Sequence, residues 1–364
     1  MRTASYNDIM GQAHSLAATI DAMAVTVPKV LQDRRSWLFT GSGASFHAAT
    51  TAAATLAAFG DVTATAAPAA EVWMNPGMWV RPGAVVVALS RTGTTTETVQ
   101  AMRTAMRVSG TTTVGFSLTS GTEIVEEAAV GLSLEWVGET GRVMTRSFSN
   151  LLLASQMLAL QAGVPAEQFS RSTVSVLPEM VASAIDSYDA LAQRLAQRPT
   201  AHVVFLGSGA RIGLCRQAAL QLQETSGLPV EAHSVLDYRH GPIASLGATS
   251  TVVILTSPRS RPADLIVAND VSTLGGTAVV VGAQEDLGAF EPATEVVPVL
   301  GDGRSWLSGN AALPFLQLFA YHLTVERDAD PESVHNLDRT KSPNINPHVL
   351  PESLFDADLV SADG

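Results

Sequence analysis

Cysteine is almost absent from this chain of 364 residues, and Cys215 alone cannot form an intrachain disulfide. A metal site built on cysteine is not expected for the same reason, and the eight histidines show no metal-ligand spacing. We therefore expect neither a metal nor another cofactor. Lysine is nearly as scarce, so Lys29 and Lys341 are the only side chains that could form a Schiff base with a carbonyl substrate.

Long apolar segments are also missing. Hydrophobic residues make up 46% of the chain, but much of this is alanine, and no segment approaches the ~20 consecutive apolar residues that span a bilayer. The first ten residues, MRTASYNDIM, carry no apolar signal core. These absences lead us to expect a cytoplasmic protein without membrane contact.

Positive charge is in short supply as well. The chain has 34 acidic and 22 basic residues, and its net charge of −12 argues against nucleic acid as a partner. The low share of charged residues, 15%, suits a compact globular enzyme. An anionic substrate is still compatible with this balance, because helix N-termini and hydroxyl groups can hold a phosphate locally.

Hydroxyl side chains gather in one stretch between Val85 and Met106, which reads VVVALSRTGTTTETVQAMRTAM. The beginning is typical of a buried parallel strand and the end of a helix. Between them, six of the nine residues from Ser90 to Thr98 carry hydroxyls, and the first N–H groups of the helix point at this turn. Helix capping would explain one such hydroxyl, whereas six favour a phosphate-type ligand. Neither a Walker A motif nor a dinucleotide fingerprint is present.

Strands and helices are predicted to alternate along the whole chain. A strand at 34–40 runs through a Gly-Ser-Gly turn into a helix, further strands are expected at 62–66, 112–118 and 130–135, and a helix begins near Thr145. This alternation predicts a doubly wound parallel sheet covered by helices on both faces, a three-layer α-β-α arrangement. Ligands of such sheets bind beyond the carboxyl ends of the strands.

The pattern then begins again, which indicates an internal duplication of about 160 residues. The segment from His202 to Ala210 matches Trp37 to Ala44 in order, with a strand, Gly-Ser-Gly-Ala and a helix. Thr251–Ser257 likewise matches Val85–Ser90, but Pro258-Arg259-Ser260 follows it in place of the threonine-rich loop. Only the first copy is therefore expected to bind phosphate through hydroxyls.

The hydroxyl-rich loop Ser90-Arg91-Thr92-Gly93-Thr94-Thr95 resembles the phosphosugar-binding loop of the sugar isomerase (SIS) domain, commonly Ser-x-Ser-Gly-x-Thr. Thr92 replaces the second serine and keeps its hydroxyl. The turn at 41–47 resembles the first substrate loop of the family, which implies a contact between Ser45 and the sugar phosphate. With neighbouring turns that open helices, the expected substrate-binding residues are Ser45, Ser90, Arg91, Thr92, Thr95, Thr145, Arg146 and Arg239.

The resemblance extends to two candidate catalytic residues, Glu224 and His240. In SIS-domain amino-sugar isomerases, a glutamate near the end of a helix is the general base, and a histidine in a His-Gly-Pro loop about sixteen residues later opens the sugar ring. Moving a proton between C1 and C2 requires one such carboxylate, and an imidazole suits proton exchange at the ring oxygen. The alternative is that Glu224 is a solvated surface group and that His240 only hydrogen-bonds its own turn.

A third candidate, Lys341, follows from one branch of the family. In the glucosamine-6-phosphate synthase branch, a lysine soon after an Asn-Leu pair forms a Schiff base with the open-chain sugar. The nearest position here is Arg339, and Lys341 follows two residues later. That branch also has lysines where this chain has Gln221 and Gln223. We expect no ammonia release from glutamine, because no N-terminal glutaminase domain with a catalytic cysteine is found.

The expected organisation is two tandem SIS domains. The domains are predicted at 35–170, which binds the phosphosugar, and 201–327, with a helical segment at 1–34, a linker helix at 171–200 and a tail at 328–364 that closes over the active site. Because the ring-opening histidine of the family comes from a neighbouring subunit, a homodimer or larger assembly with shared sites is implied.

The function implied by the resemblance is a phosphosugar aldose–ketose isomerase or deaminase. Its substrate would be an amino-sugar 6-phosphate or a ketosamine phosphate, as in the tagatose/galactosamine-phosphate isomerase-deaminases and the fructosamine-phosphate deglycases. Two alternatives stay open. One is the isomerase half of a hexosamine synthase that uses free ammonia, and the other is a sugar-phosphate sensor without turnover.

Overall fold

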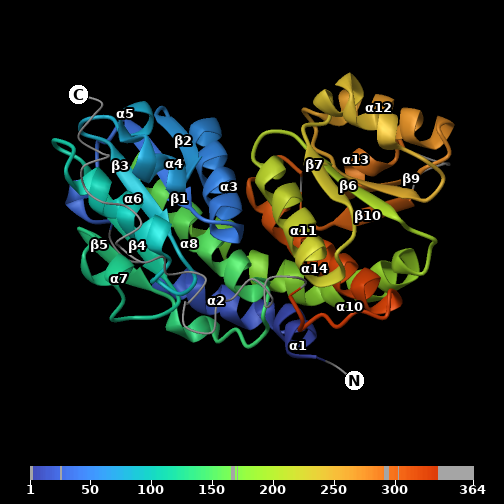
Figure 1. Ribbon diagram of the computed structural model, residues 1–364, viewed down its shortest axis with the longest axis horizontal. Coiled ribbons are helices and arrows are strands. Elements are labelled where there is room, and N and C mark those ends of the chain that lie inside the picture. The colour runs from blue at the N-terminus through green and yellow to red at the C-terminus, as the bar shows by residue number, and fades with distance from the viewer. Residues whose placement is uncertain are drawn as a thin grey trace.

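The computed structural model describes residues 3–24, 27–164, 169, 171–290, 295–301 and 303–334. Its strands form two parallel five-stranded sheets, one in each lobe of the molecule (Figure 1). The first sheet has the order β2-β1-β3-β4-β5, and the second, read from its β7 edge, has the order β7-β6-β8-β9-β10. The strands are β1 (Ser36–Gly41), β2 (Thr63–Pro68), β3 (Val85–Leu89), β4 (Thr112–Ser117), β5 (Val130–Ser133), β6 (His202–Gly207), β7 (Val230–His233), β8 (Ser250–Leu255), β9 (Thr277–Ala283) and β10 (Glu295–Val299).

The two sheets repeat one topology, as the duplication predicts. In the first, the register aligns Gly41 at the end of β1 with Leu89 at the end of β3. In the second, Gly207 of β6 aligns with Leu255 of β8 in the same way. In both sheets, the first strand of the copy therefore ends at a glycine, and the central strand beside it leads into the loop that was predicted to differ between the copies. The predicted fold class, two doubly wound parallel sheets, is confirmed.

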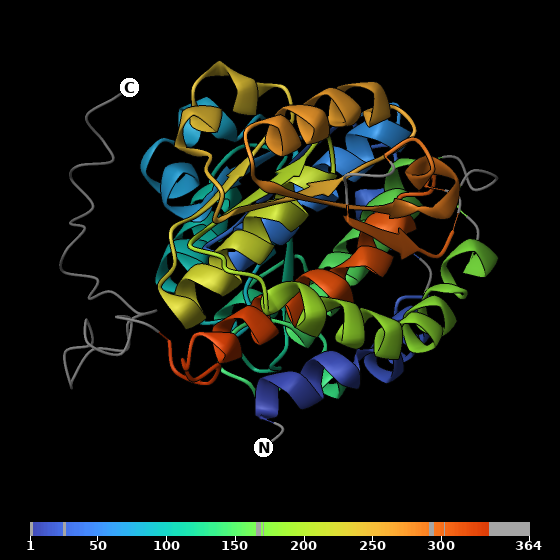
Figure 2. The same cartoon turned by 90° about the vertical axis from the view of Figure 1, so that its right-hand side faces the viewer.

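Helices cover both faces of each sheet (Figures 1 and 2), which is why a strand such as β3 is apolar and buried along its whole length. The outer face of the first sheet packs against α4 and α6, and that of the second against α12 and α13. The α-helices are α1 (Ala4–Met10), α2 (Gln12–Ala22), α3 (Ala44–Phe59), α4 (Ala69–Met74), α5 (Pro76–Trp79), α6 (Thr96–Met106), α7 (Glu123–Glu126), α8 (Arg146–Gly163), α9 (Arg171–Val174), α10 (Leu177–Ala196), α11 (Arg211–Ser226), α12 (Arg261–Thr273), α13 (Gln284–Leu287) and α14 (Leu307–Glu326).

Short 3-10 helices complete the description: η1 (Lys29–Leu31), η2 (Glu135–Val137), η3 (Asp237–His240) and η4 (Pro242–Ser245). Among the described residues, none of the helices combines the length and apolar character that crossing a bilayer requires. Both sheets lie within the ranges predicted for the two domains, while the boundaries themselves stay predictions.

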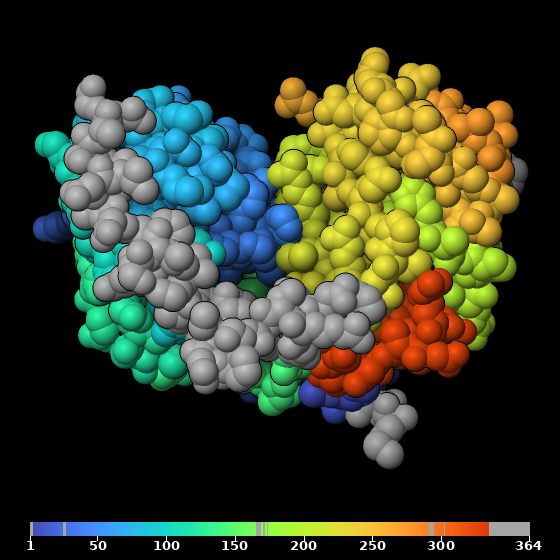
Figure 3. Space-filling view, in the orientation of Figure 1, coloured from blue at the N-terminus to red at the C-terminus, as the bar shows by residue number. Residues whose placement is uncertain are grey.

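The inner faces of both sheets share one helical layer and one core. This layer includes α3 and α8 from the first lobe and α11 and α14 from the second. The largest buried side chains of the shared core include Phe148 of α8, Phe205 of β6, and Phe315 and Phe319 of α14. Figure 3 shows a groove between the two lobes on the face that it views. The lobes are therefore joined through packed helices rather than through a flexible linker.

A close contact between the lobes lies where α3 packs against α11. A Cβ atom at Gly213 of α11 would lie 2.2 Å from Oγ1 of Thr51 and 2.5 Å from the carbonyl oxygen of His47, both on α3. Contacts this short are not tolerated by any larger residue, so the glycine sets the spacing of the two helices.

We expect Gly213→Ala to destabilise the protein by about 1–3 kcal/mol, because the added methyl group meets a backbone carbonyl that cannot move aside. The better helix propensity of alanine offsets part of this loss. The matched control is Gly77→Ala in α5, where a Cβ meets nothing within 4 Å and the free energy should change little. Urea unfolding of both variants measures the difference, and equal stability would contradict the tight crossing.

Candidate active site

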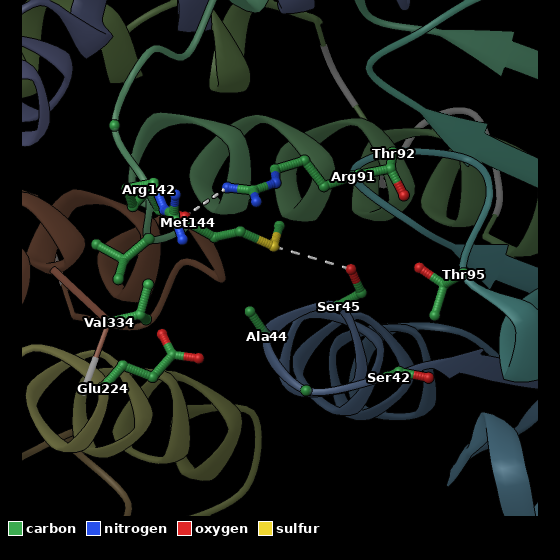
Figure 4. A pocket seen from close by; sticks show the side chains of 13 residues that line it. Ser42, Ala44, Ser45, Arg91, Thr92, Thr95, Arg142, Met144, Glu224 and Val334 are labelled. Carbon is green, nitrogen blue, oxygen red and sulfur yellow. Dashed lines mark hydrogen bonds between the residues drawn. The ribbon is translucent and has the colours of Figure 1, made fainter. Parts of the chain in front are cut away.

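A cavity of about 460 Å³ lies between the lobes, at the carboxyl ends of β1 and β3. Figure 4 shows Glu224 on one side, Ser42, Thr92 and Thr95 on the other, and Ser45 between them. This is the edge of the sheet where the alternating pattern predicted ligand binding. The lining residues are Ser42, Gly43, Ala44, Ser45, Arg91, Thr92, Thr95, Gly141, Arg142, Val143, Met144, Glu224 and Val334.

The hydroxyl-rich loop between β3 and α6 forms one wall of the cavity. Its turn depends on Gly93, whose φ of +72° is unfavourable for other residues and whose Cβ would lie 2.1 Å from Oγ1 of Thr122. Thr92 and Thr95 line the cavity. Ser90 does not: it is 1% exposed, accepts a hydrogen bond from the Gly93 N–H at 3.0 Å and lies 3.0 Å from the Thr95 hydroxyl. Ser90 therefore holds the loop in shape.

The N-terminus of α3 forms a second wall. Gly43, Ala44 and Ser45 line the cavity there, and the partial positive charge of a helix N-terminus favours an anion. Ser45 is buried, and its hydroxyl makes one long contact of 4.0 Å to the sulfur of Met144. This position leaves the hydroxyl able to bond a ligand, and its contact with a sugar phosphate stays a prediction.

Arg91 brings a positive charge to the same cavity. Its guanidinium donates to the carbonyl oxygen of Arg142 at 3.0 Å and to the carboxylate of Glu139 at 3.5 Å. Arg142 also lines the cavity, so two arginines face the acidic side chain of Glu224. This balance of charge is compatible with a bound phosphate.

Glu224 lies near the C-terminal end of α11 and is half-buried. Burial raises the pKa of its carboxyl from 4.5 to about 7, and the positive charge of Arg91 offsets part of this rise. A carboxyl whose pKa lies near neutrality can both accept and return a proton, which is what a general base for proton transfer needs. His47 is not suited to this role, because burial and the nearby Arg216 lower its pKa to about 4.

Thr145 and Arg146 have other partners in the structure. Thr145 is fully buried, and its N–H and hydroxyl donate to Glu139 at 2.8 and 3.0 Å. Arg146 pairs with the Asp8 carboxylate of α1 at 3.1 Å. Neither residue lines the cavity, and Glu139 caps the N-terminus of α8 where a ligand could otherwise bind. A direct contact of these two residues with substrate stays a prediction.

His240 and Arg239 belong to η3 of the second lobe, and both are exposed. The structure does not bring them to the cavity, and Arg239 instead pairs with Asp270 at 2.8 Å. A role of His240 in the site of another subunit stays a prediction.

The predicted Schiff-base residue, Lys341, lies outside the described residues, as does most of the predicted closing tail. Val334, the last residue before that segment, lines the cavity, and the backbone N–H of Ser5 donates to Glu332 at 2.7 Å. The start of the tail therefore lies beside the site.

Several lining residues were not predicted, and Ser42, Arg142 and Met144 are the main ones. Ser42 belongs to the Gly-Ser-Gly turn already identified, so its position in that turn was a usable signal. The segment 141–144 carries no motif, and it is held in place partly by Gln217 of α11, which donates to the Met144 carbonyl at 3.1 Å. Such a contact between distant residues leaves no sequence signal. No cluster of His, Cys, Asp and Glu able to hold a metal occurs among the described residues.

Comparison with known proteins agrees with this geometry. Residues 30–161 match the SIS domain family. The glutamine–fructose-6-phosphate aminotransferase (isomerizing) of Aeropyrum pernix is 30% identical over 317 residues, which cover 83% of this chain and 50% of that protein. The chain spans about half the length of the curated relatives it matches.

Solved structures show the same fold. The C-terminal domain of glucosamine-fructose-6-phosphate aminotransferase from Francisella tularensis superposes with a TM-score of 0.82 at 18% identity, covering 92% of this chain and 98% of that one. A glucosamine-6-phosphate deaminase from Thermotoga maritima gives 0.77 at 24% identity, with the same coverage. Residues 30–161 are therefore a SIS domain, and the second sheet repeats its topology.

Proposed function

We propose that this protein is a phosphosugar aldose–ketose isomerase or deaminase acting on an amino-sugar 6-phosphate or a ketosamine phosphate. The observation that carries this proposal is the juxtaposition of Glu224, whose pKa is about 7, with the hydroxyl-rich loop in one cavity. A phosphate held by the loop would fix one end of an open-chain sugar and direct its C1–C2 end toward the carboxylate.

In the proposed reaction, the Glu224 carboxylate removes the proton from one of the two carbons and returns it to the other. The electron pair left on the carbon passes through an enediol or enolamine, so no oxidant or cofactor is consumed. Thr92, Thr95 and Ser45 bind the phosphate together with the positive charge of Arg91. Deamination would follow if protonation of the enolamine at C1 gave an imine at C2 and water then hydrolysed this imine, which releases ammonia and leaves the ketose phosphate.

The exposed position of His240 supports a shared site in a homodimer or larger assembly. In this arrangement, His240 of one subunit would enter the cavity of the next and exchange protons at the ring oxygen. Arg239 would lie beside the same ligand. Lys341 would matter only if the open-chain sugar forms a Schiff base.

A second candidate is the synthesis of an amino-sugar phosphate from a ketose phosphate and free ammonia. It is supported by the names of the curated relatives, which are isomerizing aminotransferases. A sensor without turnover is less well supported, because a binding protein has no need of a carboxyl with a pKa near 7 in its cavity. Assaying a panel of 6-phosphosugars for ketose and ammonia formation separates these activities.

Replacing Thr92 by valine should weaken binding of a 6-phosphosugar roughly 10–100-fold, because one hydrogen bond to a charged group is lost while the shape is kept. The unphosphorylated sugar should bind with little change. Calorimetry with both sugars measures this, and Thr104→Val in α6, outside the cavity lining, is the matched control. An equal loss for both sugars would argue against phosphate binding at this loop.

Glu224→Gln should lower kcat by about 10²–10⁴-fold while substrate affinity stays near wild type, because only a proton acceptor is lost. In the wild type, activity should fall as the pH drops below about 7, where the carboxyl becomes protonated. Glu326→Gln, which changes an exposed carboxylate on α14, is the matched control and should leave kcat and substrate affinity unchanged.

Glu224→Gln should lower activity but raise stability. A loss of activity in this variant would therefore not be due to unfolding. Because the folded protein raises the pKa of Glu224, ionisation costs stability as the pH rises through about 7. Glu224→Gln should therefore match wild type at pH 4.5 and gain up to roughly 3 kcal/mol at pH 8.5. Near-normal turnover in this variant would contradict the assignment of the base.

Mixing inactive Glu224→Gln chains with inactive His240→Ala chains should restore part of the activity through hybrid sites that contain both intact residues. Each variant mixed with itself under the same exchange conditions is the control. Sedimentation should show an assembly larger than a monomer. A catalytically active monomer would rule out a shared site.

A further inference from the structure

A second cavity, of about 800 Å³, lies at the carboxyl ends of β6 and β8. Ser208 and Gly209, which follow β6, and Ser257 to Ser260, which follow β8, line it. This is the same place in the second sheet that the first cavity occupies in the first, where the turns after β1 and β3 form the walls. Each copy of the duplicated unit therefore has a cavity at the carboxyl ends of the corresponding strands.

Two buried polar atoms at this cavity have no hydrogen-bond partner within the described part of the chain. They are Oγ1 of Thr51, on α3, and Oδ1 of Asn310, on α14, in residues that are only 2% and 4% exposed. Both residues line the cavity. The amide group of Asn310 is held in this orientation because its nitrogen donates to Gln156 at 2.9 Å. An unpaired buried acceptor is costly, and a ligand hydroxyl would satisfy it.

The charged groups of the lining are mainly positive. The lining contains one carboxylate, Asp237, and three arginines, Arg211, Arg259 and Arg304. Arg211 is already used, because it donates to the Gly303 carbonyl at 3.1 Å and the Ser308 hydroxyl at 2.8 Å, with Asp264 and Asp286 near it. Arg259 is exposed and forms no hydrogen bond or ion pair with any residue that the structure describes. It is available to an anionic ligand.

The turn after β8 differs from the hydroxyl-rich loop after β3 in how its hydroxyl groups are hydrogen-bonded. Its hydroxyls are paired internally, since Ser257 and Ser260 lie 2.8 Å apart and Ser260 donates to the buried Asp264 carboxylate at 2.7 Å. Thr256 donates to the same carboxylate at 2.7 Å. An anion at this cavity would therefore be bound by arginine and not by the hydroxyls of this turn.

The remaining lining is apolar and includes Phe59, Leu214, Leu236 and Trp306. We propose that this cavity is a second ligand site, distinct from the proposed active site, for a hydroxylated phosphate monoester. Its phosphate pairs with Arg259, one of its hydroxyls donates to Asn310, and its apolar face packs on this wall. Oγ1 of Thr51 is instead packed against Gly213 of α11. Sugar phosphates and nucleoside monophosphates share this chemistry.

The test is calorimetric titration of the full chain with glucose 6-phosphate and, separately, with AMP. We expect at least one probe to bind at a site that Arg259→Ala weakens tenfold or more. The matched control is Arg107→Ala, which removes an exposed arginine of the first lobe that lines neither cavity. Which of the two probes responds identifies the source of the phosphate monoester.

Two further variants separate this site from the first cavity and test the hydroxyl contact. Thr92→Val alters the first cavity only and should leave the Arg259-dependent binding unchanged. The result at the second cavity therefore does not depend on whether the proposed catalytic function is correct. Asn310→Ala, checked for folding by circular dichroism, should weaken the hydroxylated probe but not inorganic phosphate. Equal binding of both probes to Arg259→Ala and Arg107→Ala would overturn the proposal.

Discussion

The close crossing of α3 and α11 is the contact on which the rest of the arrangement depends. Gly213 lets the two helices approach until a methyl group would lie 2.5 Å from the His47 carbonyl oxygen. Along α3 and α11, this contact sets Ser45 opposite Glu224, although the two residues come from different lobes. The same helices carry Thr51 and Leu214 into the second cavity. One packing constraint therefore shapes both cavities.

Electrostatics inside the first cavity follow from how each charge is compensated. Glu139 is buried at the N-terminus of α8, where it accepts hydrogen bonds from Thr145 and Ser147 and pairs with Arg91. Within the described part of the chain, Glu224 has no comparable set of donors, and burial therefore dominates its pKa, with Arg91 as the opposing influence. Two glutamates near the same arginine thus have different surroundings, because one is hydrogen-bonded at a helix terminus and the other faces a cavity.

The sequence was most informative where one continuous segment forms a wall of the first cavity. The strand, hydroxyl-rich turn and helix around Thr92 form one continuous segment, so the backbone geometry that exposes the hydroxyls is local and could be predicted. The doubly wound sheets were equally accessible, because apolar strands alternate with helices in both copies. Thr145 and Arg146 also lie at a helix start, but a position at a turn cannot reveal that Glu139 and Asp8 bind them instead.

The sequence by itself determined the fold class, the duplication and the identity of the hydroxyl-rich loop, because each rests on residues that are neighbours along the chain. Only the tertiary structure decided that the segment 141–144 joins the cavity, that Ser90 shapes its loop from behind, and that Glu224 is buried enough to have a pKa near 7. It also decided that the second copy retains a cavity lined by residues with unpaired buried polar atoms and by the exposed Arg259. These properties depend on burial and on contacts between distant residues, which no local pattern contains.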